Sequence, residues 1–148
     1  MTTTIDAAKL VQAMGDAVVV VDTAGLIVMW NPAATRIFGF TEEEALGRSL
    51  DIIIPERQRG RHWDGYAKTV ETGITRYGTS LLRVPALHRD GATLSIAFTV
   101  ALLTDEAGKV TAVASVIRDE TARFAEERAL KKQVTELQAR LGAGTTTP

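Results

Sequence analysis

Two histidines, His62 and His88, are the side chains in this sequence best suited to bind a metal or to move a proton near neutral pH. There is no cysteine, which excludes disulfides, thiolate metal sites, a cysteine nucleophile and a chromophore attached through sulfur. No pair of histidines stands at metal-ligand spacing, no glycine-rich loop could cradle a phosphate, and no nucleophile is paired with a base. We therefore predict a protein without catalytic activity, in which any metal would take histidine or oxygen ligands.

Taken alone, neither histidine indicates a metal site. His88 precedes Arg89-Asp90-Gly91, which has the composition of a turn, and this favours a surface position. His62 lies beside an apolar stripe at helical spacing. That stripe consists of Trp63, Tyr66, Ala67 and Val70. Residue types alone therefore favour a histidine on the partly exposed flank of a helix.

Composition and charge indicate one compact domain. The chain has 148 residues, 45% of them hydrophobic, with 17 Lys and Arg against 18 Asp and Glu. A net charge of −1 provides no broad basic face, so we predict no nucleic-acid partner. The longest apolar run, residues 17–21, is far shorter than the roughly 20 residues that span a bilayer, and no signal peptide is recognisable. We expect a cytoplasmic protein without a membrane partner.

Hydrophobic spacing and turn residues predict the elements that must position these side chains. Helices are expected at 5–14, 32–38, 41–47 and 56–72, the third opened by a capping box from Thr41 to Glu44. Strands are expected at 17–22, 26–30, 75–87, 92–103 and 109–118. This order predicts an α+β domain with a five-stranded antiparallel sheet and short helices on one face.

The C-terminal part of the chain is predicted to be a projecting helix. Residues 119–141 contain neither Gly nor Pro, and four apolar residues repeat at alternating steps of four and three: Leu130, Val134, Leu137 and Leu141. This spacing is typical of a coiled-coil seam, so we expect a homodimer through this helix. A helix folded back onto its own domain remains the alternative, although the seam is narrow for covering a sheet. Residues 142–148 are expected to form a flexible tail.

An ordered set of motifs resembles the PAS family of sensor and interaction domains. The motifs are Val20-Val21-Asp22-Thr23-Ala24-Gly25-Leu26-Ile27, Trp30-Asn31-Pro32-Ala33-Ala34, Phe38-Gly39-Phe40, Glu44-Ala45-Leu46-Gly47-Arg48, Arg89-Asp90-Gly91 and Ile117-Arg118-Asp119-Glu120-Thr121. The resemblance implies a PAS fold that encloses a small-molecule cavity, with output through the helix after the last strand to a downstream domain or protein. It divides the chain into an N-terminal helix (1–15), a PAS sensor domain (16–118), a signalling coiled-coil helix (119–141) and the tail. Asp119 and Thr121 are expected to couple the last strand to that helix by hydrogen bonds.

The stretch from Pro55 to Tyr66 resembles, more specifically, haem-binding PAS oxygen sensors of the FixL type and the related haem-regulated phosphodiesterases. The match places His62 on the position of the axial iron ligand, with Trp63 as an insertion before Asp64-Gly65-Tyr66. The resemblance thus implies haem b as cofactor, with His62 on the iron and Tyr66 in the same site. Further candidates are Leu81, Leu82, Phe98 and Val100 for an apolar distal wall, and Arg76, Arg57, Arg59 or Arg61 for the propionates.

One departure from those sensors concerns the gas that would be sensed. Many of them carry Arg or Met after the glycine that matches Gly78, whereas this chain continues Thr79-Ser80-Leu81-Leu82. An apolar distal side without a strong donor disfavours bound dioxygen relative to CO or NO. We expect a diatomic gas or the redox state to be sensed, without deciding which. A PAS dimerisation module with no cofactor, or with a small metabolite or non-covalent flavin, is the alternative.

Overall fold

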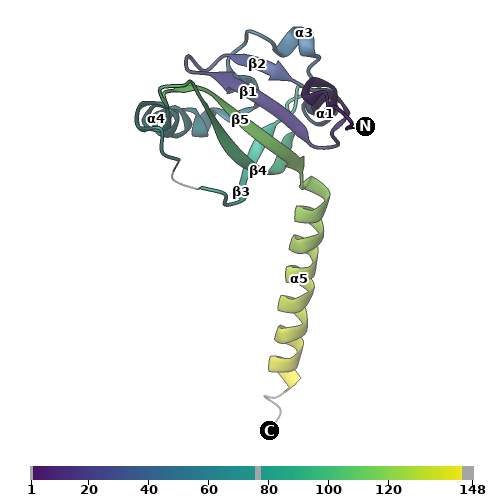
Figure 1. Ribbon diagram of the computed structural model, residues 1–148. Helices are drawn as coiled ribbons and strands as arrows, with labels where there is room; N and C mark the ends of the chain where they lie inside the picture. The colour runs from purple at the N-terminus through teal and green to yellow at the C-terminus, as the bar shows by residue number, and fades with distance from the viewer. Residues whose placement is uncertain (1, 76–77, 145–148) are drawn as a thin grey trace.

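The structure, a computed structural model, describes residues 2–75 and 78–144. Five strands form one antiparallel sheet in the order β2-β1-β5-β4-β3: β1 (Ala17–Asp22), β2 (Ile27–Trp30), β3 (Leu82–Leu87), β4 (Thr93–Thr104) and β5 (Val110–Asp119). The described helices are α1 (Ala7–Ala13), α2 (Pro32–Phe38), α3 (Glu42–Ala45), the 3-10 turn η1 (Leu50–Ile53), α4 (Glu56–Thr72) and α5 (Thr121–Gly144). The predicted α+β fold is confirmed (Figure 1).

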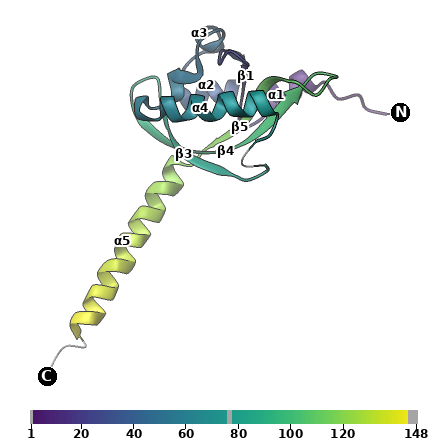
Figure 2. The same cartoon turned by 90° about the vertical axis from the view of Figure 1, so that its left-hand side faces the viewer.

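The connecting helices cover one face of the sheet, and α5 projects away from the domain. Figure 2 shows α2, α3 and α4 on the same side of the strands, and α5 leaving from the end of β5. The inner face of the sheet and these helices share one hydrophobic cluster, centred on Val19, Trp30, Phe38, Ile96 and Ile117. Alternate strand residues point inward, as the period of two requires. Among residues 2–75 and 78–144, no helix is long and apolar enough to cross a membrane.

Local signals account for several helix ends. Asp6 caps α1, and Thr41 and Glu44 form the predicted capping box, in which each side chain accepts the other residue's backbone N–H. Helix α4 ends where Gly73 adopts the left-handed conformation with φ +70°. The helix predicted over 56–72 therefore has the expected bounds.

The third strand is shorter than predicted. The expected strand began at residue 75, whereas β3 begins at Leu82. Gly78 has φ +56°, which an extended strand cannot accommodate, so the chain turns before pairing starts. β3 is an edge strand and contains Pro85, which has no N–H to donate to a neighbour. The turn before β3 could not be predicted from the β-branched and apolar composition on which the longer strand was based.

Glu44 joins the helical layer to the β3–β4 turn. Its carboxylate accepts the Thr41 backbone N–H at 3.2 Å and pairs with the Arg89 guanidinium at 2.8 Å. The hydrogen bond from the Thr41 backbone is the largest cause that lowers the pKa of Glu44 below its usual value of 4.5. Burial opposes this shift, while Arg89 and Arg48 add to it. The ionised form of Glu44 is therefore stabilised by folding.

Replacing Glu44 with glutamine is expected to make the free energy of unfolding depend less steeply on pH in the acid range. Because the pKa of Glu44 is lower in the folded than in the unfolded chain, its contribution is present above about pH 4.5 and is lost as the pH falls through the folded value. Urea midpoints measured from about pH 5 to about pH 3 should fall less steeply in Glu44→Gln than in the wild type. Glu43→Gln, a neighbouring exposed acid on α3, is the control and should keep the wild-type slope. Equal slopes in all three proteins would contradict the assignment.

Two glycines in the interior of α4 are expected to weaken that helix. Gly60 and Gly65 are exposed, and a Cβ built on either meets nothing within 4 Å. Gly60→Ala and Gly65→Ala should each raise the free energy of unfolding by about 0.5–1 kcal/mol in urea denaturation. Gly73→Ala is the contrasting variant, since its positive φ disfavours alanine and predicts a loss of stability. A destabilised Gly65→Ala would show that the residue serves another purpose.

Candidate functional site

His62 lies on α4, where its ring packs against Trp63 and Tyr66 in a cluster of three rings whose other two members also contact each other, at 5.2 Å between centroids. Its ring centroid is 4.6 Å from that of Trp63, which meets it edge-on at 82°. Tyr66, one helical turn later, is 6.1 Å away and nearly parallel, with 25° between the planes. The Nδ1 atom of His62 is buried and makes no hydrogen bond within the described part of the chain. The aromatic contacts therefore hold a ring that has an unused nitrogen.

Burial favours the neutral form of the His62 imidazole. Removal from water lowers the pKa of His62 below its usual value of 6.5, and the negative charge of Asp51 opposes part of this shift. A neutral imidazole is the form that binds a metal ion. Burial thus favours the form of the ring that ligation requires.

Two hydrogen-bonded side chains attach α4 to the rest of the domain beside His62. The Trp63 indole N–H donates to Asp51 Oδ1 at 2.7 Å. The Tyr66 hydroxyl donates to the backbone carbonyl of Asp22, at the end of β1. Burial, followed by the charge of Asp22, raises the pKa of Tyr66 to about 12. Tyr66 therefore remains protonated, and it serves as an anchor of α4 and a neighbour of the His62 ring.

Three of the four predicted wall residues share the inner face of the sheet. Leu82 pairs with Phe98, and Val100 follows two residues later on β4, so all three lie on the side that carries Ile96 and Ile117. They are partly exposed, whereas the inner residues of β1, such as Val19 at 1%, are buried. The inner face is thus incompletely covered on the β3–β4 side.

Leu81 lies apart from this wall. It is 49% exposed and lines a groove of about 230 Å³ with Ala97, Thr99 and Val116, which belong to the outer face of the sheet. The turn before β3 sets this position, because the strand alternation begins only at Leu82. Leu81 is therefore not part of the proposed wall.

The arginines predicted to bind the propionates differ in whether they are already engaged by the protein. Arg59 is already engaged: its guanidinium donates to the backbone carbonyls of Ile54 and Asp51, at 3.0 and 3.3 Å. Arg57 and Arg61 are exposed on α4, at positions on either side of Arg59. Arg76 lies outside the described residues. Arg57 and Arg61 are thus the described cations on this helix that remain as candidates.

Two residues near the site were not singled out from the sequence. Asp51 is brought to Trp63 across twelve positions by the η1 turn, and no local pattern signals that contact. Ser115 lies in β5 opposite Val19 and Val100, which places it on the inner face of the sheet by register. Its place between Val113 and Ile117 at period two is the signal that could have located it.

The residues around His62 supply part of what a haem group needs. Four of the ligands of a haem iron come from the porphyrin, so the protein needs to supply one imidazole. His62 offers a half-buried imidazole whose Nδ1 is unpartnered and whose neutral form is favoured by burial, and the partly covered inner face offers an apolar surface. Within residues 2–75 and 78–144, no three His, Cys, Asp or Glu side chains gather to hold a metal ion by themselves.

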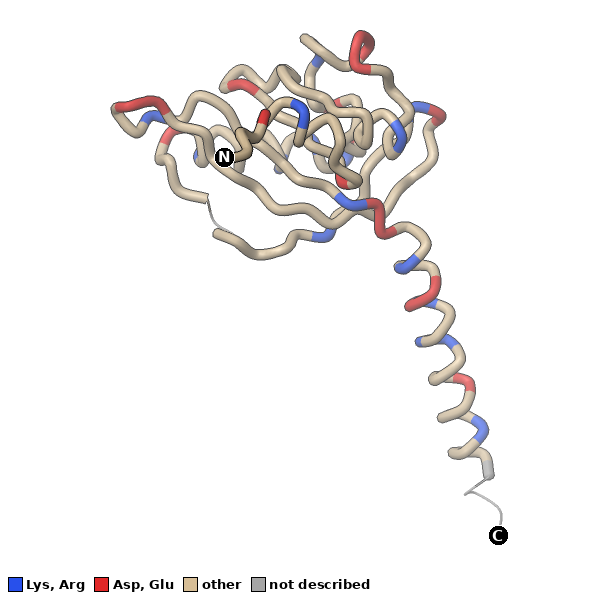
Figure 3. The backbone as a smooth tube through the Cα atoms, turned by 45° about the vertical axis from the view of Figure 1, so that its right-hand side comes forward, with Lys and Arg blue, Asp and Glu red and all other residues tan. Residues whose placement is uncertain are grey.

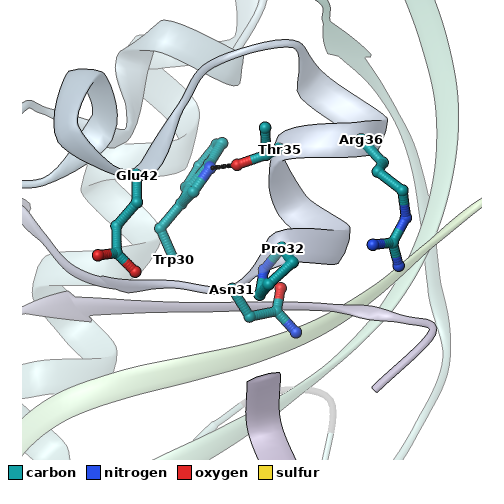
Figure 4. Close-up of a pocket in the computed structure, with 6 residues that line it drawn as sticks. All are labelled: Trp30, Asn31, Pro32, Thr35, Arg36 and Glu42. Atoms are coloured by element: carbon teal, nitrogen blue, oxygen red, sulfur yellow. Dashed lines mark hydrogen bonds between the residues drawn. The ribbon is translucent and has the colours of Figure 1, made fainter. Parts of the chain in front are cut away.

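A second hollow lies away from His62, where β2 meets α2. It measures about 380 Å³ and is lined by Trp30, Asn31, Pro32, Thr35, Arg36 and Glu42. Figure 4 shows Arg36 and Glu42 on opposite sides of it, with the Trp30 indole N–H donating to the Thr35 hydroxyl at 3.1 Å. None of the predicted site residues lines this hollow.

Charges are dispersed over the molecule. Basic and acidic residues alternate along α5 and are scattered over the domain (Figure 3). This distribution agrees with the near-balanced composition.

The family comparison places the chain in a known class. The PAS fold profile matches residues 6–119, and the chain therefore belongs to the PAS family of sensory domains. A solved PAS domain from Colwellia psychrerythraea superposes with a TM-score of 0.69 at 23% identity, covering 78% of this chain and 95% of that one. This likeness confirms the fold predicted from the motifs.

Three curated proteins are similar in sequence. An uncharacterized protein of Azorhizobium caulinodans is 36% identical over 118 residues, which is 79% of this chain and 16% of that protein. Sensor protein FixL of Bradyrhizobium diazoefficiens is 35% identical over 86 residues, or 57% and 17%. Oxygen sensor protein DosP of Escherichia coli is 25% identical over 108 residues, or 73% and 13%. The chain spans less than a fifth of the length of each of these proteins.

Proposed function

We propose that this chain is a non-catalytic PAS sensor that binds haem b through His62 and responds to a diatomic gas or to the redox state. The observation that carries the proposal is the buried, unpartnered Nδ1 of His62, on the helix whose sequence resembles that of haem-binding PAS sensors. The similarity to a protein named an oxygen sensor supports the diatomic-gas class of ligand. A bound haem would supply an iron centre able to take such a ligand or to change its oxidation state.

Each described residue would have a separate task in this site. His62 offers the neutral nitrogen, and Tyr66 packs against the face of its ring. Leu82, Phe98 and Val100 would exclude water from an apolar chamber, and Arg57 or Arg61 would meet the propionates. This wall carries no charge, so bound dioxygen would be disfavoured relative to CO or NO.

Strand β4 connects the proposed chamber to α5. Phe98 lies on β4 three residues after Ser95, whose backbone N–H donates to the Thr121 hydroxyl at 3.0 Å. The Glu120 N–H donates back to the Ser95 carbonyl at 2.8 Å, and the Thr121 N–H donates to Asp119 at 2.9 Å. A shift of β4 at Phe98 would thus be delivered to the first turn of α5.

Helix α5 would carry the signal as one half of a homodimer. Its seam residues are 51–71% exposed in the single chain: Leu130, Val134, Leu137 and Leu141. Pairing two such seams removes these apolar side chains from water. A downstream signalling domain or protein would receive the output.

A PAS dimerisation module without haem, or with a small metabolite, is the second candidate. It is favoured by the packing of Trp63 and Tyr66 against the core beside His62, and by the absence of His62 from the lining of both hollows described above. This candidate retains α5 and its seam. The two functions differ in whether His62 binds iron.

Titration with haemin distinguishes the two candidates. Purified wild-type protein should bind one haemin per chain with a sharp Soret band, and His62→Ala should weaken the affinity by at least about a hundredfold. His88→Ala is the matched control, because it removes the other histidine. His88 lies in the β3–β4 turn, and its ring packs over Gly39 at the end of α2. Circular dichroism would establish that all three proteins are folded.

The outcomes separate clearly. A Soret band lost in His62→Ala and kept in His88→Ala supports haem ligation by His62. A wild-type protein that stays colourless with added haemin, or a His62→Ala variant that binds as tightly as the wild type, rejects the proposal in favour of the second candidate.

A further inference from the structure

Trp63, the residue that interrupts the resemblance to haem-binding PAS helices, is fixed at both ends of its indole. Its N–H donates to Asp51 Oδ1 at 2.7 Å. Its outer ring lies so close to Gly25 that a Cβ at that glycine would come within 2.7 Å of Trp63 Cη2. The indole therefore has one defined orientation between η1 and the β1–β2 turn.

Asp51 is itself held in place from two sides. The Ser49 hydroxyl accepts its backbone N–H at 3.1 Å, which fixes the first turn of η1. Arg59 of α4 donates to the Asp51 carbonyl at 3.3 Å and lies 3.9 Å from its carboxylate. The acceptor of the indole is thus tied to the same helix that carries His62.

The His62 ring lacks the polar contact that usually orients a ligating histidine. Such a histidine ordinarily donates the N–H of its second nitrogen to a carboxylate, carbonyl or water. His62 makes no hydrogen bond within residues 2–75 and 78–144, and its ring contacts there are those with Trp63 and Tyr66. Aromatic packing must then set the ring plane, and Trp63 is the nearer of the two rings.

We infer that Trp63, locked by its hydrogen bond to Asp51, is a positioning residue that sets the orientation of the His62 imidazole toward the haem iron. This inference rests on the proposed haem function and adds a specific role to residues outside the resemblance. A merely structural Trp63 would affect stability alone. A positioning Trp63 also affects affinity and the geometry of the imidazole on the iron.

Three substitutions test the chain of contacts from Asp51 to His62. Asp51→Leu removes the acceptor and keeps a branched, though larger, side chain, Asp51→Asn keeps an acceptor oxygen without the charge at nearly equal volume, and Trp63→Phe keeps an aromatic ring without the N–H. The matched control is Asp64→Asn, an exposed acid next to Trp63 with no hydrogen bond or ion pair to another described residue. Circular dichroism identifies any variant that does not fold. If Asp51→Leu does not fold, Trp63→Phe is the variant that decides the test.

The readouts are haemin affinity and the electron paramagnetic resonance spectrum of the ferric protein, whose g-values depend on the plane of the axial imidazole. Asp51→Leu and Trp63→Phe should raise the haemin dissociation constant about tenfold to a hundredfold and shift or broaden the g-values. Asp51→Asn should restore both to near the wild type, and Asp64→Asn should change neither. Wild-type affinity and g-values in both Asp51→Leu and Trp63→Phe would overturn the inference.

Failure of the inference is distinguishable from failure of the proposed function. If the wild type binds haemin through His62 and the Asp51 and Trp63 variants are neutral, the positioning role is rejected and the haem function stands. If the wild type binds no haemin, both are rejected together.

Discussion

Replacing Asn31 with leucine is expected to lower the free energy of unfolding by about 3–5 kcal/mol. Asn31 is fully buried, and its Oδ1 accepts the backbone N–H groups of Val18 and Ala34 at 2.9 and 3.1 Å. Its Nδ2 donates to the carbonyls of Val11 and Asp16 at 2.9 and 3.1 Å. Leucine keeps the branched shape but is larger, and it removes the partners of the Val18 N–H and the Asp16 carbonyl, whereas the Ala34 N–H and the Val11 carbonyl each keep a backbone hydrogen bond. Each unsatisfied buried group costs about 1–3 kcal/mol.

Urea denaturation at equilibrium measures this loss. The comparison variant is Asp6→Ala, which removes the cap of α1 and leaves the core untouched, so it should cost about 1 kcal/mol or less. If Asn31→Leu costs no more than Asp6→Ala, then Asn31 would merely attach α1, and the central role assigned to its four hydrogen bonds would be wrong.

Replacing Leu137 with aspartate is expected to abolish a dimer held by α5. Leu137 occupies the middle of the seam, and a symmetric dimer loses its side chain twice. Burial of one leucine stabilises by about 1.5–3 kcal/mol, so two losses raise the dissociation constant by at least about a hundredfold. No further apolar residue extends the seam toward the domain. Its next two positions in that direction are Glu127 and Arg123, which form an ion pair at 3.4 Å.

Sedimentation equilibrium on the full chain measures the change in mass. The wild type should sediment as a dimer and Leu137→Asp as a monomer. Ala139→Asp, which adds the same charge on the opposite face of α5, is the control and should remain dimeric. A wild type that is monomeric at all concentrations, or a Leu137→Asp variant that stays dimeric, would contradict the proposed role of the seam.

The fold could be predicted from local signals because most of its elements carry them. Several helix ends are marked by residues that lie within a few positions of them in the sequence. Examples are Pro32 at the start of α2, the capping box from Thr41 at α3, and the glycine after α4. β3 is the exception, since apolar composition does not report that Gly78 adopts a positive φ. The start of a strand depends on backbone conformation and pairing, which the residue types of 75–81 did not indicate.

The candidate site was less predictable because its contacts join distant residues. The position of His62 on a helix followed from spacing, and its role followed from resemblance. Tertiary structure alone shows that Arg59 is engaged with η1, that Leu81 lies beside the outer face, and that Asp51 accepts the Trp63 N–H. Each of these contacts depends on where a turn places a side chain, which periodicity within one helix or strand does not determine.

Electron-nuclear double resonance on the ferric protein, reconstituted with haemin and labelled with nitrogen-15 in its histidines, tests most directly whether His62 binds iron. The account predicts a strong nitrogen-15 coupling from one imidazole in the wild type and in His88→Ala, and its loss in His62→Ala. An unchanged coupling in His62→Ala, or a wild-type protein that takes up no haemin, would contradict it.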